Sequence, residues 1–202
     1  MSSLEDSSQI FRYHREMISR HGTESSFALG WLTPQDQQAR FAVLAGIADL
    51  NGRSVLDAGC GYADLYPFLL QRYPDLAHYT GVEQIPELAN KAIRCYGHLP
   101  GTDFIGRSFL RGSLPLNDYA LVSGSLNYGS SLPGYIYQAI DTLFSLCRRG
   151  LGFNLLSATA DEGLLVAYEA GDILAYCRTL SDNIKIVKDY VEDDFTIFMY
   201  KS

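Results

Sequence analysis

The spacing of hydrophobic positions changes along the chain at about residue 53. Before that point, apolar side chains recur at helical spacing over residues 9–19 and 34–48, and Thr33 followed by Pro34 is a typical start for the second helix. Beyond it, short apolar runs alternate with stretches of helical spacing. The runs predict strands at 53–59, 78–84, 102–109, 119–126 and 151–159. The stretches between them predict helices at 63–73, 86–97, 134–150 and 172–181, the third of which ends at Gly150.

The end of the chain has a different pattern. Residues 184–187 and 195–200 alternate between hydrophobic and polar side chains, which is typical of strands with one buried face. The polar stretch between them is short, so the two strands are expected to form an antiparallel hairpin at one edge of a sheet. Its acidic residues 192–194 are interpreted as a solvated turn.

Strands that alternate with helices predict a mostly parallel sheet with helices on both faces. With the terminal pair, the fold class is α/β: a three-layer α/β/α sandwich around a seven-stranded sheet with a C-terminal antiparallel hairpin. A chain of 202 residues fits one domain. We expect residues 51–202 to form a Rossmann-like core and residues 1–50 a helical lid on the substrate side.

Composition narrows the class of partner. Hydrophobic residues make up 47% and charged residues 19% of the chain, as in globular proteins, and the formal net charge of −7 disfavours a nucleic-acid partner. No apolar run approaches the about 18 residues of a membrane span, and the polar N-terminus does not resemble a signal peptide. The four cysteines are widely spaced and the histidines show no paired ligand spacing. We therefore expect a cytoplasmic protein with reduced thiols, no membrane segment and no metal.

The candidate ligand site begins where the first apolar strand ends, in "SVLDAGCGYADL". Gly59 and Gly61 allow a tight turn and the close approach of a ligand, although a pair of glycines alone could equally well only close a turn. Two acids favour the ligand. Asp57 ends the first strand, where a buried carboxylate needs hydrogen bonds, and Glu83 ends the second, where an acid can accept bonds from a ribose diol. The arrangement predicts an adenosine-binding site.

The kind of adenosine ligand follows from what the loop lacks. A dinucleotide site has a third glycine, but here Asp64 occupies that position, and its charge at a helix start opposes a pyrophosphate. A Walker A loop is absent from the sequence, which disfavours ATP. A ligand with a positive centre and without phosphate fits better, and S-adenosylmethionine is such a ligand.

Several segments together resemble a class I S-adenosylmethionine-dependent methyltransferase, a seven-stranded Rossmann-like family. The resemblance covers about Trp31 to Lys201 and rests on "VLDAGCGYADL", "YTGVEQIPELANKA", "DYALVSGSLNY" and the closing "FTIFMYK". The lead-in "ESSFALGWLTPQDQQARF" is similar to small bacterial members whose substrates are unassigned. The resemblance implies S-adenosylmethionine as cofactor, S-adenosylhomocysteine as product, and methyl transfer as the activity.

The resemblance also implies roles for individual residues. Asp57, Gly59 and Gly61 would surround the methionine part of the cofactor, and Glu83 would hold the ribose hydroxyls. An acid or amide often follows the third strand in this family, but this chain has Arg107 and Ser108 there, which leaves adenine recognition to Ser108 or to backbone groups. The remaining implied contacts are Gln84 and Ile85 beside the adenine, and Ser123, Gly124 and Ser125 around the methyl-donor pocket.

The catalytic residues are not assigned by any motif. Methyl transfer mainly requires that the acceptor be held in line, and a base is needed only if the acceptor must lose a proton early. "SLNYG" lacks the two prolines of the amino-methylating pattern. The candidates are His14 as a base, and Asn127 and Tyr128 as acceptor or cofactor contacts. In the N-terminal segment, Arg40 could pair with the cofactor carboxylate or form a surface or interhelix salt bridge.

Three functions remain open at this point. The first is methyl transfer to an unidentified, small-molecule acceptor, because the chain is short and acidic. The second is a catalytically idle module that binds an adenosine cofactor, because the sequence shows no certain base. The third, which the missing glycine disfavours, is a dinucleotide-dependent oxidoreductase. The accepting atom and the oligomeric state are not determined by the sequence.

Overall fold

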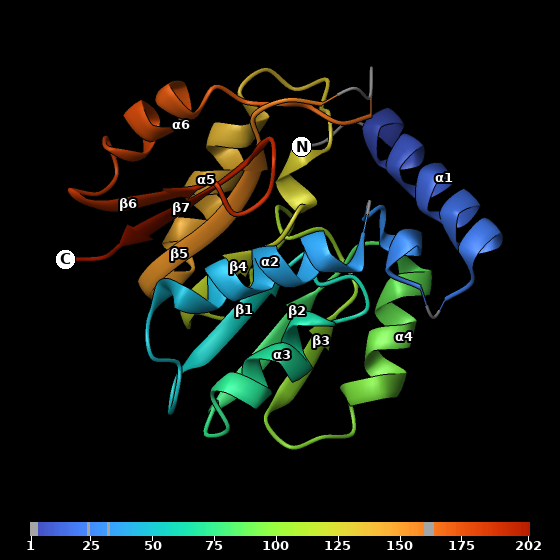
Figure 1. The fold of residues 1–202 in the computed structure, drawn as a ribbon. Helices are drawn as coiled ribbons and strands as arrows, with labels where there is room; N and C mark the ends of the chain where they lie inside the picture. Colours follow the sequence, from blue (N-terminus) through green and yellow to red (C-terminus); the bar gives the residue numbers. More distant parts are fainter. Residues whose placement is uncertain (1–3, 24, 32, 160–163) are drawn as a thin grey trace.

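The computed structural model describes residues 4–23, 25–31, 33–159 and 164–202, and the side chains of residues 4–7 are left out of the description. Its centre is a seven-stranded sheet with the order β3-β2-β1-β4-β5-β7-β6 (Figure 1). The strands are β1 Ser54–Ala58, β2 His78–Val82, β3 Thr102–Ile105, β4 Asn117–Val122, β5 Cys147–Leu156, β6 Asn183–Lys188 and β7 Asp194–Tyr200.

Helices cover both faces of this sheet, so the structure confirms the predicted three layers. One hydrophobic core joins α2 and α3 to the sheet through residues such as Phe41 and Leu69, and the other joins α5 and α6 through Ile140 and Ile173. The helices are α1 Leu4–His21, α2 Pro34–Leu44, α3 Leu65–Arg72, α4 Pro86–Tyr96, α5 Tyr135–Ser145 and α6 Ala170–Cys177. Short 3-10 turns are η1 Ser26–Leu29, η2 Ala45–Ile47 and η3 Ser125–Asn127.

The sheet topology creates a switch point between β1 and β4. These strands are parallel neighbours, but the chain leaves β1 toward β2 on one side and β4 toward β5 on the other. Loops after β1 and β4 therefore diverge and leave room for a ligand at the carboxyl ends of the two strands. At the far edge, β7 pairs antiparallel with both β5 and β6, which confirms the predicted terminal hairpin.

The prediction that a helix runs to Gly150 is wrong. Helix α5 ends at Ser145, and β5 begins at Cys147, so Gly150 lies inside a strand. A Cβ on Gly150 would lie 2.8 Å from the backbone oxygen of Met199 in β7. The close approach of the neighbouring strand therefore explains the glycine. In the sequence alone, a glycine that ends a helix cannot be distinguished from a glycine inside a strand.

The N-terminal segment packs beside the carboxyl edge of the sheet. Helix α1 lies next to α4 (Figure 1), where Arg15 forms an ion pair with Glu87 at 2.8 Å. Ile10 of α1 shares a small hydrophobic cluster with Ile85 and Leu88. This position agrees with the expected lid, which stays a prediction. Within the described residues, no helix combines the length and the apolar character that crossing a membrane requires.

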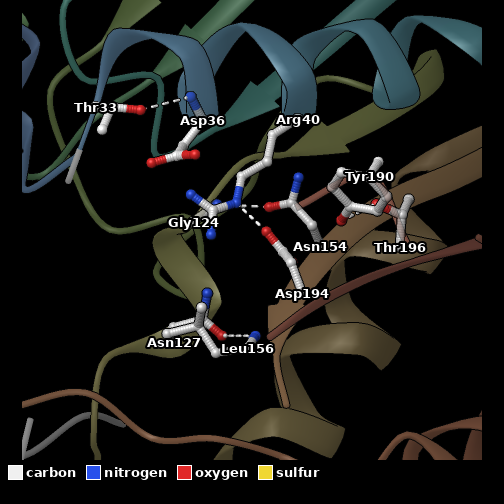
Figure 2. Close-up of polar contacts among 10 residues, drawn as sticks. All are labelled: Thr33, Asp36, Arg40, Gly124, Asn127, Asn154, Leu156, Tyr190, Asp194 and Thr196. Atoms are coloured by element: carbon white, nitrogen blue, oxygen red, sulfur yellow. Dashed lines mark hydrogen bonds and ion pairs between the residues drawn. The ribbon is translucent and has the colours of Figure 1, made fainter. Parts of the chain in front are cut away.

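Helix α2 begins at a side-chain cap, which gives a first prediction. The Thr33 hydroxyl accepts a hydrogen bond from the backbone N–H of Asp36 at 3.1 Å, as Figure 2 shows. Thr33→Ala should lower the free energy of unfolding by about 1 kcal/mol, because it removes this cap. Thr33→Ser, which keeps the hydroxyl, should stay close to the parent in urea unfolding. Equal losses in the two variants would contradict the capping role.

Candidate functional site

A cavity of about 820 Å³ lies at the switch point. Its walls come from the loops after β1, β2, β3 and β4, from α1 and α2, and from the turn between β6 and β7. All of the predicted cofactor and catalytic residues line it: Asp57, Gly59, Gly61, Glu83, Gln84, Ser108, Ser123, Gly124, Arg40, His14, Asn127 and Tyr128. The fold thus brings into one cavity residues that are spread over more than a hundred positions of the chain.

The glycine loop after β1 has a backbone that requires glycine. Gly59 has φ +81°, and a Cβ there would lie 2.3 Å from the Cβ of Ser125 in the loop after β4. Gly61 has φ +57°, and a Cβ there would lie 2.9 Å from the end of the Leu29 side chain. Both conformations are in the left-handed region that favours glycine. At Gly59 the glycine therefore also allows the loops after β1 and β4 to touch.

Glu83 connects the loops after β1 and β2. Its carboxylate accepts hydrogen bonds from the backbone N–H of Gly61 at 2.9 Å and of Ile85 at 2.8 Å. Burial raises the pKa of Glu83 above its usual value, and bonds from Ile85, Gly61 and Gln84 oppose that rise. The hydrogen bonds from Gly61 and Ile85 use two of the about four acceptor positions of a carboxylate, and the backbone of Gln84 adds a third contact. Glu83 is thus fixed in place and retains acceptor capacity on the cavity wall.

Asp57 is held differently, inside the end of β1. The hydroxyl of Tyr79 donates to its carboxylate at 2.5 Å, and the residue is only 2% exposed. The pKa of Asp57 rises from 3.8 to about 7, because burial penalises the charged form. The bond from Tyr79 opposes this rise, whereas the nearby charges of Glu83 and Asp64 add to it. The carboxyl therefore changes charge close to neutral pH.

The raised pKa of Asp57 predicts a pH-dependent stability. Between about pH 4 and pH 7 the folded protein keeps a proton that the unfolded chain has lost, so the free energy of unfolding falls as pH rises, by at most about 1.4 kcal/mol per pH unit. Asp57→Asn removes this titration. Relative to the parent, the variant should therefore gain stability between about pH 4 and pH 8 in urea unfolding. A constant difference between the two proteins would contradict the raised pKa.

The loop after β4 is held by hydrogen bonds to both neighbouring strands. The N–H of Gly124 donates to the side-chain oxygen of Asn154 at 3.0 Å, as Figure 2 shows, and Ser125 Oγ donates to the carbonyl of Ala58 at 2.6 Å. The hydroxyl of Ser123 is buried and has no hydrogen-bond partner among the described residues. In the loop after β3, Ser108 Oγ accepts from the N–H of Leu110 at 3.3 Å.

Arg40 of α2 lines the cavity and is already paired. Its Nε donates to Asp194 in a buried ion pair, shown in Figure 2, and its guanidinium lies 4.9 Å from the ring centre of Trp31. The prediction that residues 192–194 form a solvated turn is wrong for Asp194, because this residue is only 6% exposed and begins β7. Burial raises its pKa, and the charge of Arg40 opposes that rise.

The three catalytic candidates fall into two groups. The side-chain oxygen of Asn127 accepts from the N–H of Leu156 at 2.9 Å (Figure 2), and its carbonyl accepts from Val166 at 2.7 Å. Asn127 thus anchors the loop to β5. His14 and Tyr128 instead contact each other, with 2.7 Å between Nε2 and the phenol oxygen. The structure brings them together from positions 114 residues apart.

Three residues of the site were not found from the sequence. Asn154 and Asp194 support the β4 loop and Arg40, and Gln37 donates to Asp64 at 3.1 Å at the start of α3. Asn154 is a polar residue within an apolar strand pattern. Because a buried polar side chain needs a hydrogen-bond partner, this pattern could have indicated its supporting role. Among the described residues, no group of His, Cys, Asp and Glu has the geometry of a metal site.

Solved structures of other proteins share this architecture, whereas sequence comparisons find no match. No protein-family model and no curated protein matches the sequence. Solved structures do match: magnesium protoporphyrin IX methyltransferase from Synechocystis PCC 6803 with bound SAH has a TM-score of 0.65 and 17% identity, covering 83% of this chain and 84% of that one. The chain has the class I methyltransferase fold.

Two other structures support the same fold. Human N-acetylserotonin methyltransferase in complex with SAM has a TM-score of 0.69 and 14% identity, covering 100% of this chain and 60% of that one. The N-methyltransferase NodS from Bradyrhizobium japonicum WM9 in complex with S-adenosyl-L-homocysteine has a TM-score of 0.63 and 16% identity, covering 84% of this chain and 88% of that one. At these identities the likeness concerns the fold, and the chemistry has to be argued from this chain's own residues.

Proposed function

We propose that this protein transfers a methyl group from S-adenosylmethionine to a small-molecule acceptor. The observation that carries the proposal is the clamp formed by Glu83 and the Gly59–Gly61 loop at the switch point of a methyltransferase fold. Three structures with this fold were solved with S-adenosylmethionine or S-adenosylhomocysteine. The cavity of about 820 Å³ is of a size that can hold such a cofactor and a small acceptor.

The residues present fit the cofactor. The remaining acceptor positions of Glu83 suit a ribose diol, and the absent Cβ atoms of Gly59 and Gly61 leave space for the methionine part. Gln84 and Ser108 would lie beside the adenine, and Ser123 and Gly124 beside the methyl donor. These four assignments rest on the cavity lining. Asp57, which lines the same cavity, would lie beside the methionine part.

Arg40 would reach the cofactor carboxylate through its terminal nitrogens, because its Nε is used by Asp194. The planar guanidinium can serve two partners in this way. The bound cofactor would supply an electrophilic methyl group on a good leaving sulfur. The protein's own part is to hold the acceptor in line and to keep water out.

Two other functions, a dinucleotide-dependent oxidoreductase and a catalytically idle module that binds an adenosine cofactor, are not favoured. Asp64 lies at the start of α3 and binds Gln37, so a pyrophosphate would meet a carboxylate there. The cavity also extends beyond the cofactor residues to Tyr128 and Tyr135, which leaves an acceptor side that a purely cofactor-binding module would not need.

The four cysteines are unpaired, which fits a reducing compartment such as the cytoplasm.

The proposal predicts a large effect of Glu83 on cofactor affinity. Glu83→Ala should raise the Kd for S-adenosylhomocysteine by about 100-fold or more, because each hydrogen bond to a charged group contributes about 1.5–3 kcal/mol. Glu83→Gln keeps one acceptor oxygen and should lose about tenfold. The matched control is Glu169→Gln, an exposed acid before α6. Isothermal titration calorimetry measures all three, and parent-like binding by Glu83→Ala would place the ribose elsewhere.

A further inference from the structure

The cavity wall that follows β3 carries hydrogen-bond donors instead of an acid. Arg107, Ser108 and Phe109 line the cavity at this point, and none of them has a carboxylate. A guanidinium has five N–H donors and no acceptor. The hydroxyl oxygen of Ser108 already accepts from the N–H of Leu110 at 3.3 Å, which leaves its proton to donate. A ligand that reaches this wall therefore meets donors.

Arg107 lies close to the acid that is proposed to hold the ribose. β2 and β3 are parallel neighbours (Figure 1), and Val82 is paired with Ile105 at their ends. The backbone N–H groups of Glu83 and Arg107 both donate to the carbonyl of Ile105, each at 3.0 Å. Both residues line the same cavity. A nucleoside whose ribose is bound by Glu83 would therefore have its base within reach of the loop after β3.

The guanidinium of Arg107 is only partly used by the protein. Its Nη2 donates to the carbonyl of Ser113, which holds the side chain against its own loop. Gly112 makes room for it there, because a Cβ at that glycine would lie 2.8 Å from Nη1. Nε is buried and has no hydrogen-bond partner among the described residues. The side chain thus keeps donors for an acceptor on a ligand.

Purine bases differ in what they offer to a guanidinium. Adenine presents the acceptor N7 next to a donor, the amino group on C6, so an arginine can bind N7 but finds no acceptor beside it. A purine with a carbonyl oxygen on C6 presents two adjacent acceptors, which match the fork of an arginine. Hypoxanthine is such a base, since it is adenine with oxygen in place of the amino group. An acid on the wall would have the opposite preference, because it would accept from the amino group.

We propose that Arg107 determines which purine the cofactor site accepts, by donating to N7 and to an acceptor on C6, and that the site binds the hypoxanthine form of the ligand at least as tightly as the adenine form. This inference rests on the proposed function and deepens it. Glu83 and the glycine loop are assigned to the ribose and the methionine part, which the two forms share. The selection between the bases is therefore left to the wall after β3.

The test compares S-adenosylhomocysteine with S-inosylhomocysteine, which differ only in the base. Isothermal titration calorimetry of the parent should give a Kd for the inosyl form that is equal to or below the Kd for the adenosyl form. Arg107→Asp replaces the donors by an acceptor and should reverse this order, with the adenosyl form bound about tenfold more tightly. The matched control is Arg111→Asp, an exposed arginine of the same loop outside the described cavity lining, which should keep the order of the parent.

The outcomes separate this inference from the proposed function. If the parent does not bind S-adenosylhomocysteine, the proposed function fails and the inference fails with it. If the parent binds it but binds the inosyl form more weakly, or if Arg107→Asp keeps the order of the parent, only the role of Arg107 is overturned.

A second variant covers the case in which Arg107→Asp does not fold, as judged by urea unfolding. Arg107→Met removes the donors and adds no acceptor. It should raise the Kd for the inosyl form by about tenfold and the Kd for the adenosyl form by less, because adenine loses only the bond at N7. Equal increases for the two ligands would overturn the role of Arg107.

Discussion

Gly59→Ala is expected to lower the free energy of unfolding by about 2–5 kcal/mol and to abolish cofactor binding. Two costs add at this position. A non-glycine residue at φ +81° is strained by about 1–3 kcal/mol, and the new Cβ would lie 2.3 Å from the Cβ and 2.6 Å from the Oγ of Ser125. Ser125 cannot simply rotate away, because its hydroxyl holds Ala58 and its backbone begins η3. Relief would have to come from separating the loops after β1 and β4.

Urea unfolding and calorimetry with S-adenosylhomocysteine measure this effect. The matched control is Gly171→Ala, where φ is not positive and a Cβ meets nothing within 4 Å, so stability should be equal or slightly higher. The double variant Gly59→Ala with Ser125→Gly separates the two costs, since it removes the clash and leaves the backbone strain. A Gly59→Ala protein that binds the cofactor like the parent would show that the two loops need not touch.

Arg40→Met is expected to destabilise the protein by about 3–5 kcal/mol, because it leaves the carboxylate of Asp194 buried and unpaired. The side chain of Asp194 is 1% exposed and that of Arg40 is 12% exposed, so water replaces little of the lost interaction. One carboxylate oxygen of Asp194 already lacks a hydrogen-bond partner among the described residues. Loss of Arg40 would also remove the ion pair between α2 and β7, and α2 carries one wall of the cavity.

The double variant Arg40→Met with Asp194→Asn should recover much of this loss, because no buried charge then remains. Arg15→Ala breaks an ion pair with Glu87 whose side chains are 62% and 37% exposed, and it should cost at most about 1 kcal/mol. Chemical denaturation of the three variants provides the comparison. Equal effects of Arg40→Met and Arg15→Ala would contradict the importance of burial.

The order of strands and helices was predictable from the sequence because the period of hydrophobic positions depends on local backbone geometry. The glycine loop and Glu83 were predictable for a related reason. Residues at the ends of successive parallel strands meet at one edge of the sheet, so a short-range pattern specifies a three-dimensional site. The roles of Gly59 in touching Ser125 and of Gly150 in admitting β7 were not visible, because each depends on a distant strand.

Pairings across the fold could not be predicted either. Arg40 and Asp194 are 154 residues apart, and His14 and Tyr128 are 114 residues apart. Neither pair has a spacing that sequence periodicity can detect. The sequence left open whether Arg40 pairs with a cofactor or forms a salt bridge. The structure shows a salt bridge from its Nε to Asp194, which is buried at the start of β7, and the cofactor contact of the terminal nitrogens stays a proposal.

The central claim is that the clamp of Glu83 and the glycine loop holds S-adenosylmethionine. Isothermal titration calorimetry of the parent protein with S-adenosylhomocysteine, NAD and ATP tests it most directly. We expect saturable binding of S-adenosylhomocysteine at one site per chain, and no measurable binding of NAD or ATP. Failure of S-adenosylhomocysteine to bind at millimolar concentration, or tighter binding of NAD, would contradict the claim.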